Sequence, residues 1–450
     1  MFSQLLAIAR NAFVESVRQP VFFVLIAVSG LAQVVNNVLS AYSMGYEDTS
    51  EVHGDDKLFL DMGLATVLLC ATLLAAFIAT AVISREIEQK TALTVISKPV
   101  GRPLFVIGKY LGVSASMLLA TLIMLFFFLL TLQHGVMSRA SDVYDQPVLT
   151  LGLGSIALSL AIGVWCNFFY GWVFSSTTVF SMLPLTGVAV IATLMLGPSW
   201  QLQPITKELK PLILMACGGV GMAMLVITAV AVSCSTRLGQ VMTIVACLGV
   251  FVFGLLSNHF VGRRAFVNRA IETIATAERV EDRQGDLRDA GDTWRITLSG
   301  DPKQNLKAGD SFYFAGDPSG IAMAAPAFPK FAGNPLSLSD IGTPPSGPAL
   351  IVRAVENRRN LTIVNAGGLR VERPPVAGDF VFDKPTKVNL GARLLWGVMP
   401  NVQFFWLVDA VTQNHPIPAR YMGLLAGYSL AQIVALLSLG VALFQTREVG

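Results

Sequence analysis

Long apolar stretches constrain this chain more than any other feature of its sequence. Eight of them are long enough for a helix to cross the roughly 30 Å hydrocarbon core of a bilayer: about 21–41, 62–83, 107–133, 149–172, 176–196, 212–233, 240–258 and 420–443. Of the 450 residues, 53% are hydrophobic and only 14% are charged. The sequence therefore predicts a polytopic α-helical membrane protein with about eight transmembrane helices.

The stretch from 149 to 196 has to be divided between two helices. One continuous helix of that length would measure about 70 Å at 1.5 Å per residue, which is more than twice the thickness of the core. We expect a tight turn near the sequence YGWVFSST, residues 170–177.

Lysine and arginine gather in short segments that share one side of the membrane if there are eight spans. These segments are the N-terminal residues, the connection 84–109, the CSTRLGQ turn at 234–240 and the QTREVG tail at 445–450. Because cytoplasmic connections carry the excess of Lys and Arg, both termini are expected in the cytoplasm and the region after residue 258 outside. A seven-span alternative would place 259–418 in the cytoplasm.

The two segments that flank the first seven spans, 21–258, are expected to lie along the membrane. Residues 1–20 predict a cytoplasmic interfacial helix, because apolar side chains recur on one side of it at helical spacing: Leu5, Leu6, Ala9, Phe13 and Val17. The apolar part of residues 398–419 is too short to span the membrane. These residues predict a short helix in the outer leaflet, followed by the last span and the cytoplasmic tail at 420–450. Its candidate residues are Phe404, Phe405, Trp406 and Asp409. Asp409 is expected to face water or cap a neighbouring helix, with contact to substrate as the alternative.

The composition changes abruptly after residue 258. Residues 259–290 predict a juxtamembrane helix, because Phe266, Ala270, Ile274 and Ala277 are spaced for one apolar face. Residues 291–397 predict a β-rich exoplasmic domain, a small antiparallel sandwich or barrel, on the runs TWRITL, DSFYFAG, ALIVRAV, LTIVNA and DFVFD. Expressed alone from about 290 to 395, it should fold without disulfides, since the five cysteines all lie in or at the end of apolar runs: Cys70, Cys166, Cys217, Cys234 and Cys247.

The phrase AGDSFYF at 308–314 recurs loosely as AGDFVFD at 377–383. Each copy places a Gly-Asp pair before an aromatic strand. Hairpin turn chemistry explains the recurrence; paired ligand loops are the alternative.

The residues offer little chemistry of their own. There is no Walker loop of the form G-x-x-x-x-G-K-[ST], and the four histidines stand apart without a second ligand at metal spacing. Ionisable side chains are almost absent from the spans, where Asp61 and Lys109 stand only at the ends, whereas a secondary carrier normally needs such groups near the midplane. We expect no enzyme activity, no metal, no cofactor and no nucleic-acid partner, and an energy source in another chain.

The charged connection carries a specific resemblance. SREIEQKTALTVISKPVGRPLFVIGKYLG, residues 84–112, resembles the connection after the second span of type-2 ATP-binding-cassette (ABC) export permeases. The family pattern is R-E-x-E-x-x-T, then S-[KR]-P, then G-K-x-L at the start of the third span. The resemblance extends over roughly 1–260 and 398–450. The β-rich region falls outside it, and the basic family unit has six spans.

The resemblance implies a bacterial inner-membrane subunit of an ATP-driven exporter. The connection 84–107 would dock on a separate ATPase subunit, with Arg85, Glu86, Glu88 and Thr91 in the contact and Lys98 and Arg102 against the anionic inner leaflet. It also implies a second permease copy or a paralogue, so homodimer and heterodimer both stay open.

A different class of function remains as the alternative. The chain could be a membrane-anchored scaffold that transports nothing and presents its β domain to a periplasmic or cell-surface protein. Charge reversal at Glu86 and Glu88 separates the two, because it should uncouple an exporter from its ATPase and leave a scaffold's outer binding intact.

Overall fold

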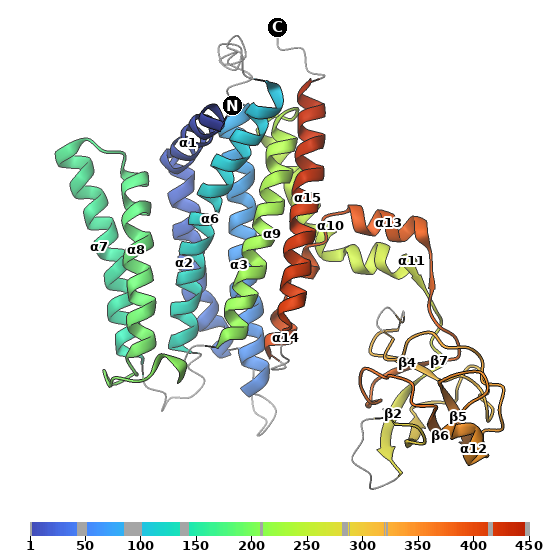
Figure 1. Cartoon of the computed structure of the whole chain (residues 1–450). Helices are drawn as coiled ribbons and strands as arrows, with labels where there is room; N and C mark the ends of the chain where they lie inside the picture. The colour runs from blue at the N-terminus through green and yellow to red at the C-terminus, as the bar shows by residue number, and fades with distance from the viewer. Residues whose placement is uncertain are drawn as a thin grey trace. The chain divides into compact units, whose positions relative to one another are not determined.

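Two compact units make up the chain in the computed structural model (Figure 1). One is formed by Met1–Leu255 with Pro400–Gly450, and the other by Leu256–Met399. The structure describes residues 2–42, 52–84, 101–135, 144–207, 210–280, 287, 289–318, 320, 323–412 and 417–445. Each unit is considered by itself below.

The first unit is helical throughout. Its elements are α1 (Phe2–Arg18), α2 (Pro20–Tyr42), α3 (Val52–Ala79) with a π-helical end η1 (Thr80–Ser84), α6 (Arg102–His134), α7 (Gln146–Tyr170), α8 (Phe174–Met195), η2 (Ile205–Lys207), α9 (Pro211–Ser235), α10 (Gln240–Ser257), η4 (Val402–Phe405), α14 (Val408–Thr412) and α15 (Ala419–Gln445). The start of α1 and the end of α15 lie at the same end of the unit (Figure 1).

Eight helices among the described residues are long and apolar enough to cross a membrane. They are Pro20–Ser40, Lys57–Ser84, Arg102–His134, Gln146–Tyr170, Phe174–Met195, Pro211–Ser235, Gln240–Ala265 and Ala419–Gln445. A ninth arises only if Leu390–Val398 and Val402–Thr412 are counted together as one broken span. The predicted multi-pass helical architecture is confirmed.

The predicted break between 149 and 196 is a turn of three residues between α7 and α8. Gly171 adopts a left-handed φ of 65°, which residues with a Cβ rarely adopt, and its N–H donates to the Asn167 carbonyl at 3.1 Å. The turn folds the two helices into a hairpin beside α6 and α2 (Figure 1).

The core of the helical unit lies where α3, α6 and α9 pack together, and these three spans are the most buried of the eight. Polar side chains on α2 donate hydrogen bonds to oxygen atoms of α3 inside this packing. Gln33 Nε2 donates to the Gly63 carbonyl at 2.9 Å, and Asn36 Nδ2 donates to Thr66 Oγ1 at 2.9 Å. Such bonds satisfy groups that lipid cannot.

The second unit begins with the end of a span and continues into a sheet. Its elements are η3 (Asn258–Gly262), α11 (Arg263–Ala265), β1 (Phe266–Val267), β2 (Glu272–Arg279), β3 (Thr293–Leu298), β4 (Tyr313–Ala315), α12 (Leu338–Gly342), β5 (Ala349–Val355), β6 (Asn360–Ala366), β7 (Phe380–Phe382), β8 (Lys387–Val388) and α13 (Leu390–Val398). Strands β1 and β8 pair as a ribbon, and the other six form a sheet in the order β4-β7-β2-β3-β6-β5.

This six-stranded sheet closes into a barrel. The residues just before β4 pair with β5, since Phe312 N donates to the Leu350 carbonyl at 2.9 Å and Val352 N donates to the Asp310 carbonyl at 3.0 Å. Closure leaves β4 and β5 without a free edge, which protects a sheet against pairing with other chains. Of the two predicted forms, sandwich and barrel, the structure has the barrel.

The barrel consists of two similar halves, β2-β3-β4 and β5-β6-β7. In each half the first strand pairs with the second across a register shift at the corresponding place, between Ile274 and Thr276 in β2 and between Val352 and Ala354 in β5. The second strands pair with each other, as do the third strands. This arrangement is that of an approximate internal two-fold.

The recurring Gly-Asp phrases are corresponding turns of these halves. Asp310 Oδ2 accepts from Lys307 N at 2.8 Å, and Asp379 Oδ2 accepts from Val376 N at 3.0 Å. The glycine N–H groups then donate to Val352 and Ile274 respectively, each at 2.8 Å. Both carboxylates therefore close turns, as hairpin turn chemistry requires.

The predicted juxtamembrane helix over 259–290 is wrong beyond Ala265. Helix ends there, and β1 and β2 occupy Phe266–Val267 and Glu272–Arg279. The bulge after Ile274 interrupts the alternation that would have marked a strand, because an extra residue shifts the following side chains by one position. The barrel therefore begins at Glu272, before the predicted boundary at 291.

Candidate functional site

Helix ends converge at one end of the helical unit, which we call the coupling end. Ser84 Oγ, at the end of η1, donates to the Leu238 carbonyl after α9 at 2.8 Å. Arg102 Nη1, at the start of α6, donates to the Gln445 carbonyl of α15 at 2.7 Å. Arg237 Nε donates to the Leu443 carbonyl at 2.9 Å. The connection 84–107 therefore begins and ends where hydrogen bonds join the ends of α3, α6, α9 and α15.

Arg102 also packs against the end of α15. Its guanidinium lies 6.0 Å from the centre of the Phe444 ring, and Phe105 stacks on the same ring at 5.7 Å. A cation at carbonyls of the last helical turn is favourable because the helix dipole is negative there. The other predicted coupling residues lie outside the described residues: Arg85, Glu86, Glu88, Thr91 and Lys98.

The G-K-x-L part of the charged motif, residues 108–111, and Gly112 directly after it pack against the N-terminal helix α1. A Cβ on Gly112 would stand 2.2 Å from the Ala9 carbonyl oxygen, so only glycine lets the two helices approach this closely. Lys109 lies beside it with 2% of its side chain exposed, 3.7 Å from Glu15 of α1. Helix α1 is therefore docked on α6 through Lys109 of the motif and the adjoining Gly112.

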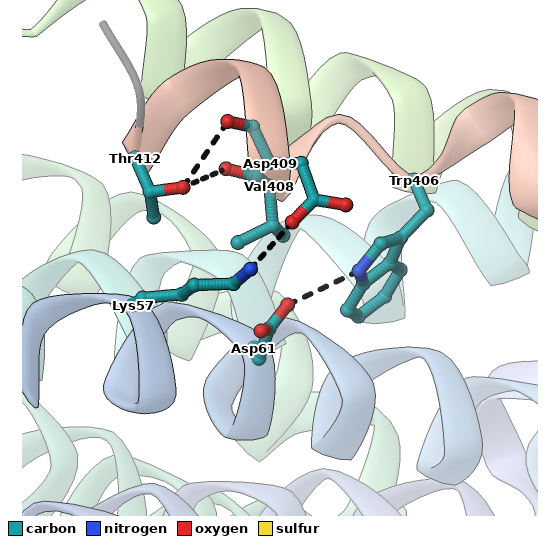
Figure 2. Close-up of polar contacts among 6 residues, drawn as sticks. All are labelled: Lys57, Asp61, Trp406, Val408, Asp409 and Thr412. Atoms are coloured by element: carbon teal, nitrogen blue, oxygen red, sulfur yellow. Dashed lines mark hydrogen bonds and ion pairs between the residues drawn. The ribbon is translucent and has the colours of Figure 1, made fainter. Parts of the chain in front are cut away.

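At the other end of the helical unit, α3 is joined to residues 400–412, which we call the 400–412 segment. Lys57 Nζ donates to Asp409 Oδ1 at 2.7 Å, and Trp406 Nε1 donates to Asp61 Oδ1 at 3.1 Å. Figure 2 shows both contacts reaching from α3 to the segment. We call these two contacts the latch.

The 400–412 segment is also bound to α15. Tyr421 OH donates to the Phe404 carbonyl at 2.7 Å, and the Asn401 N–H donates to Tyr428 OH at 3.0 Å. Phe405 is buried, with 3% exposed. Where the sequence predicts one short helix over 398–419, the structure has two single turns, η4 and α14, between α13 and α15.

Asp409 is predicted to face water, and it does so while pairing with Lys57. The side chains are 66% and 46% exposed, respectively. Solvent screens an ion pair as exposed as this one, so the contact can be broken at little cost. The latch therefore suits a reversible contact better than a permanent structural one.

Helix α3, with η1, connects the latch to the coupling end. The span Lys57–Ser84 has 28 residues, or about 40 Å at 1.5 Å per residue, and carries the latch at one end and the connection 84–107 at the other. Its last turn, η1, is π-helical, a local distortion that is frequent at functional positions of helices.

Sequence reasoning missed several of these contacts. Lys57 and Asp61 find partners more than 340 residues away, and Ser84 and Arg237 act through backbone carbonyls that no motif marks. The position of Lys57 and Asp61 one helical turn apart at a span end was the available signal, because charges there need water or a partner.

The second unit has a cleft of about 1000 Å³ between the β1-β8 ribbon and the barrel. Its lining includes Phe266, Met323, Arg370, Glu372, Thr386 and Val388. Among the described residues, no group of three or more His, Cys, Asp or Glu is placed to hold a metal ion.

Comparison with known proteins covers part of the chain. Residues 6–169 match the family described as ABC-2 family transporter protein. This match supports an ABC-2 type permease over that part of the chain. The match runs from α1 into α7 and includes the connection 84–107, so the predicted resemblance to this family is confirmed over residues 6–169. The barrel lies outside it. No curated protein and no solved structure matches the chain.

The family match and the long apolar helices together support a multi-pass permease subunit of an ABC transporter. Permeases of this family are transport subunits that work with an ABC ATPase and often as dimers.

Proposed function

We propose that this chain is the membrane-spanning subunit of an ATP-driven exporter in the bacterial inner membrane, with both termini in the cytoplasm. The ATPase subunit docks on the connection 84–107 through Arg85, Glu86, Glu88 and Thr91, while Lys98 and Arg102 hold the returning segment at the inner leaflet. The observation that carries the proposal is the coupling end, where both anchors of the connection are bonded to the ends of α9 and α15.

The coupling end offers a route for ATPase closure to reach the spans. A displacement of the connection acts on Ser84 and Arg102 together, and through their bonds on α9 and α15. Packed helices move as rigid bodies more readily than they deform. The ends of α3 and α6 would therefore move as one group.

Movement of α3 would then act on the latch. Because α3 is continuous from Lys57 to Ser84, a shift at the coupling end changes the position of Lys57 and Asp61 relative to the 400–412 segment. The Lys57–Asp409 pair is exposed and screened by solvent, so it resists such a displacement only weakly. The latch opens when the transport path opens. That path lies between this chain and a second copy of it or a paralogue.

The experiment is co-purification of the tagged full chain from its own membranes in mild detergent, followed by an assay of ATP hydrolysis. Wild type is compared with Glu86→Lys/Glu88→Lys and with a deletion of 86–96. Glu356→Lys is the matched control, since it reverses an exposed acid on the barrel. We expect an ATPase with a Walker motif to co-purify with wild type and the control, and to be lost from both connection variants.

Two outcomes contradict the proposal. If the connection variants retain the ATPase and its activity, the coupling assignment is wrong. If no ATPase co-purifies with wild type, and an outer-surface protein is instead held through residues 291–397, the chain is a scaffold.

A further inference from the structure

The helix α13 presents an apolar surface that nothing in its own unit covers. None of its nine residues is buried. Four aliphatic side chains lie on one side of it, which we call the α13 face: Leu390 (70% exposed), Leu394 (71%), Leu395 (56%) and Val398 (72%). A soluble surface rarely gathers four such side chains on two and a half turns of helix.

The opposite side of α13 is packed on the end of a candidate membrane span. Trp396 Nε1 donates to Asn258 Oδ1 in η3 at 3.1 Å, and the Trp396 ring meets Phe266 edge to face at 5.8 Å. Arg393 lies over the same Phe266 ring at 6.0 Å. These contacts fix α13 to η3 and β1, and α13 also packs on α11. The elements η3 and α11 are the last two turns of the span Gln240–Ala265.

The length of that span sets the depth of these turns. Its 26 residues measure about 39 Å, which exceeds the roughly 30 Å hydrocarbon core, so its last turns reach the headgroup region. Phe260, in η3, is 50% exposed. A helix attached there with its aliphatic side outward lies at the boundary between acyl chains and headgroups, where amphipathic helices bind.

Charge in the same segments fits a membrane surface. Residues 256–271 and 384–399 contain no Asp or Glu. They carry exposed cations, which we call the basic rim: Arg263, Arg264, Arg269, Lys387, Arg393 and Lys384, the last of which pairs with Asp383 at 3.3 Å. Basic residues in the segments that carry an exposed aliphatic face favour anionic phospholipid.

We propose that α13, together with η3 and α11, is a membrane-surface element. The α13 face inserts among the acyl chains of the adjoining leaflet, and the basic rim binds anionic phospholipid headgroups. The element thereby holds the base of the barrel at the membrane, whichever molecule the permease transports.

The test is photo-cross-linking of the full-length protein in nanodiscs that contain phosphatidylglycerol and phosphatidylcholine. Benzoylphenylalanine replaces Leu394 or Val398, and in the matched control it replaces Leu338, an aliphatic residue of the barrel that is 76% exposed. We expect phospholipid adducts in the intact mass at 394 and 398 and none at 338. A covalent dimer at 394, or adducts no more abundant than at 338, would overturn the proposal.

A second measurement uses the unmodified protein, since a bulky cross-linker can disturb α13. Backbone amides of 390–398 should exchange hydrogen more slowly in nanodiscs with phosphatidylglycerol than in phosphatidylcholine alone, while those of α12 should not change. Equal exchange of 390–398 in the two lipids would refute the binding of anionic headgroups.

Discussion

The docking of α1 on α6 makes a sharp prediction for Gly112→Ala. The new Cβ would stand 2.2 Å from the Ala9 carbonyl oxygen and 2.7 Å from Ala12 Cβ. Ordinary contact begins at 3.4 Å, so α1 must withdraw by at least 3.4 − 2.2 = 1.2 Å. The obstacle is backbone, which cannot rotate away as a side chain can.

Overpacking of this kind costs about 1–3 kcal/mol. Since each 1.4 kcal/mol changes an equilibrium constant tenfold, the population of molecules with α1 undocked should rise about 5- to 150-fold. Hydrogen exchange of residues 2–18 in the full-length protein measures that population directly.

Substitutions at two further glycines provide comparisons for the effect of Gly112→Ala. Gly108→Ala meets Ile8 Cγ2 at 2.8 Å and Ile8 Cβ at 3.0 Å, a less severe overlap than with the Ala9 carbonyl, and Gly221→Ala on α9 meets nothing within 4 Å. We therefore expect faster exchange of α1 in the order Gly112→Ala, then Gly108→Ala, with Gly221→Ala at the wild-type rate. If Gly112→Ala leaves the exchange of α1 unchanged, close packing at Gly112 does not hold α1 on α6.

Three other predictions concern the barrel. Arg373→Gln removes two 2.6 Å bonds to the buried Asp379 carboxylate and should destabilise the barrel by about 1–3 kcal/mol, seen as faster exchange of barrel amides. A fragment of residues 266–399 should fold, whereas one of 290–395 should not, because it lacks β2 from the middle of the sheet; circular dichroism decides, and a folded 290–395 would contradict the closed barrel. The hydrogen bond from Arg359 lowers the pKa of Asp301 below its ordinary 3.8, so the stabilisation is present above that value and is lost as the pH falls through the lowered pKa. Asp301→Asn should accordingly be slightly less stable than wild type at pH 7, and the two should converge in acid; a constant difference would argue against this ion pair.

The spans and most strands could be predicted because their signals are local. Apolar length marks each span, and TWRITL and ALIVRAV coincide with β3 and β5. The strand β2 was mistaken for helix because its bulge after Ile274 breaks the period of two, while Phe266, Ala270 and Ile274 happen to recur every four residues.

The contacts of the site were less predictable because they join distant parts of the chain. The resemblance of residues 84–112 indicates where an ATPase would dock, but Arg102 reaches the carbonyl of Gln445 by a tertiary contact that local sequence does not encode. The latch similarly joins Lys57 to Asp409. Barrel closure and the α13 face depend on register and orientation, which follow from three-dimensional packing.

The central claim is that α3 connects ATPase coupling at one end to movement of the 400–412 segment at the other. The most direct measurement bridges Lys57→Cys and Asp409→Cys with a short bifunctional thiol reagent in the assembled complex, and compares ATP hydrolysis before and after bridging. The matched control bridges Asp301→Cys and Arg359→Cys, an exposed pair on the barrel with the same 2.7 Å contact in the native protein. If the account is right, bridging the latch suppresses ATP hydrolysis while the ATPase stays bound, and bridging the barrel does not. Unchanged hydrolysis with the latch fully bridged would contradict it.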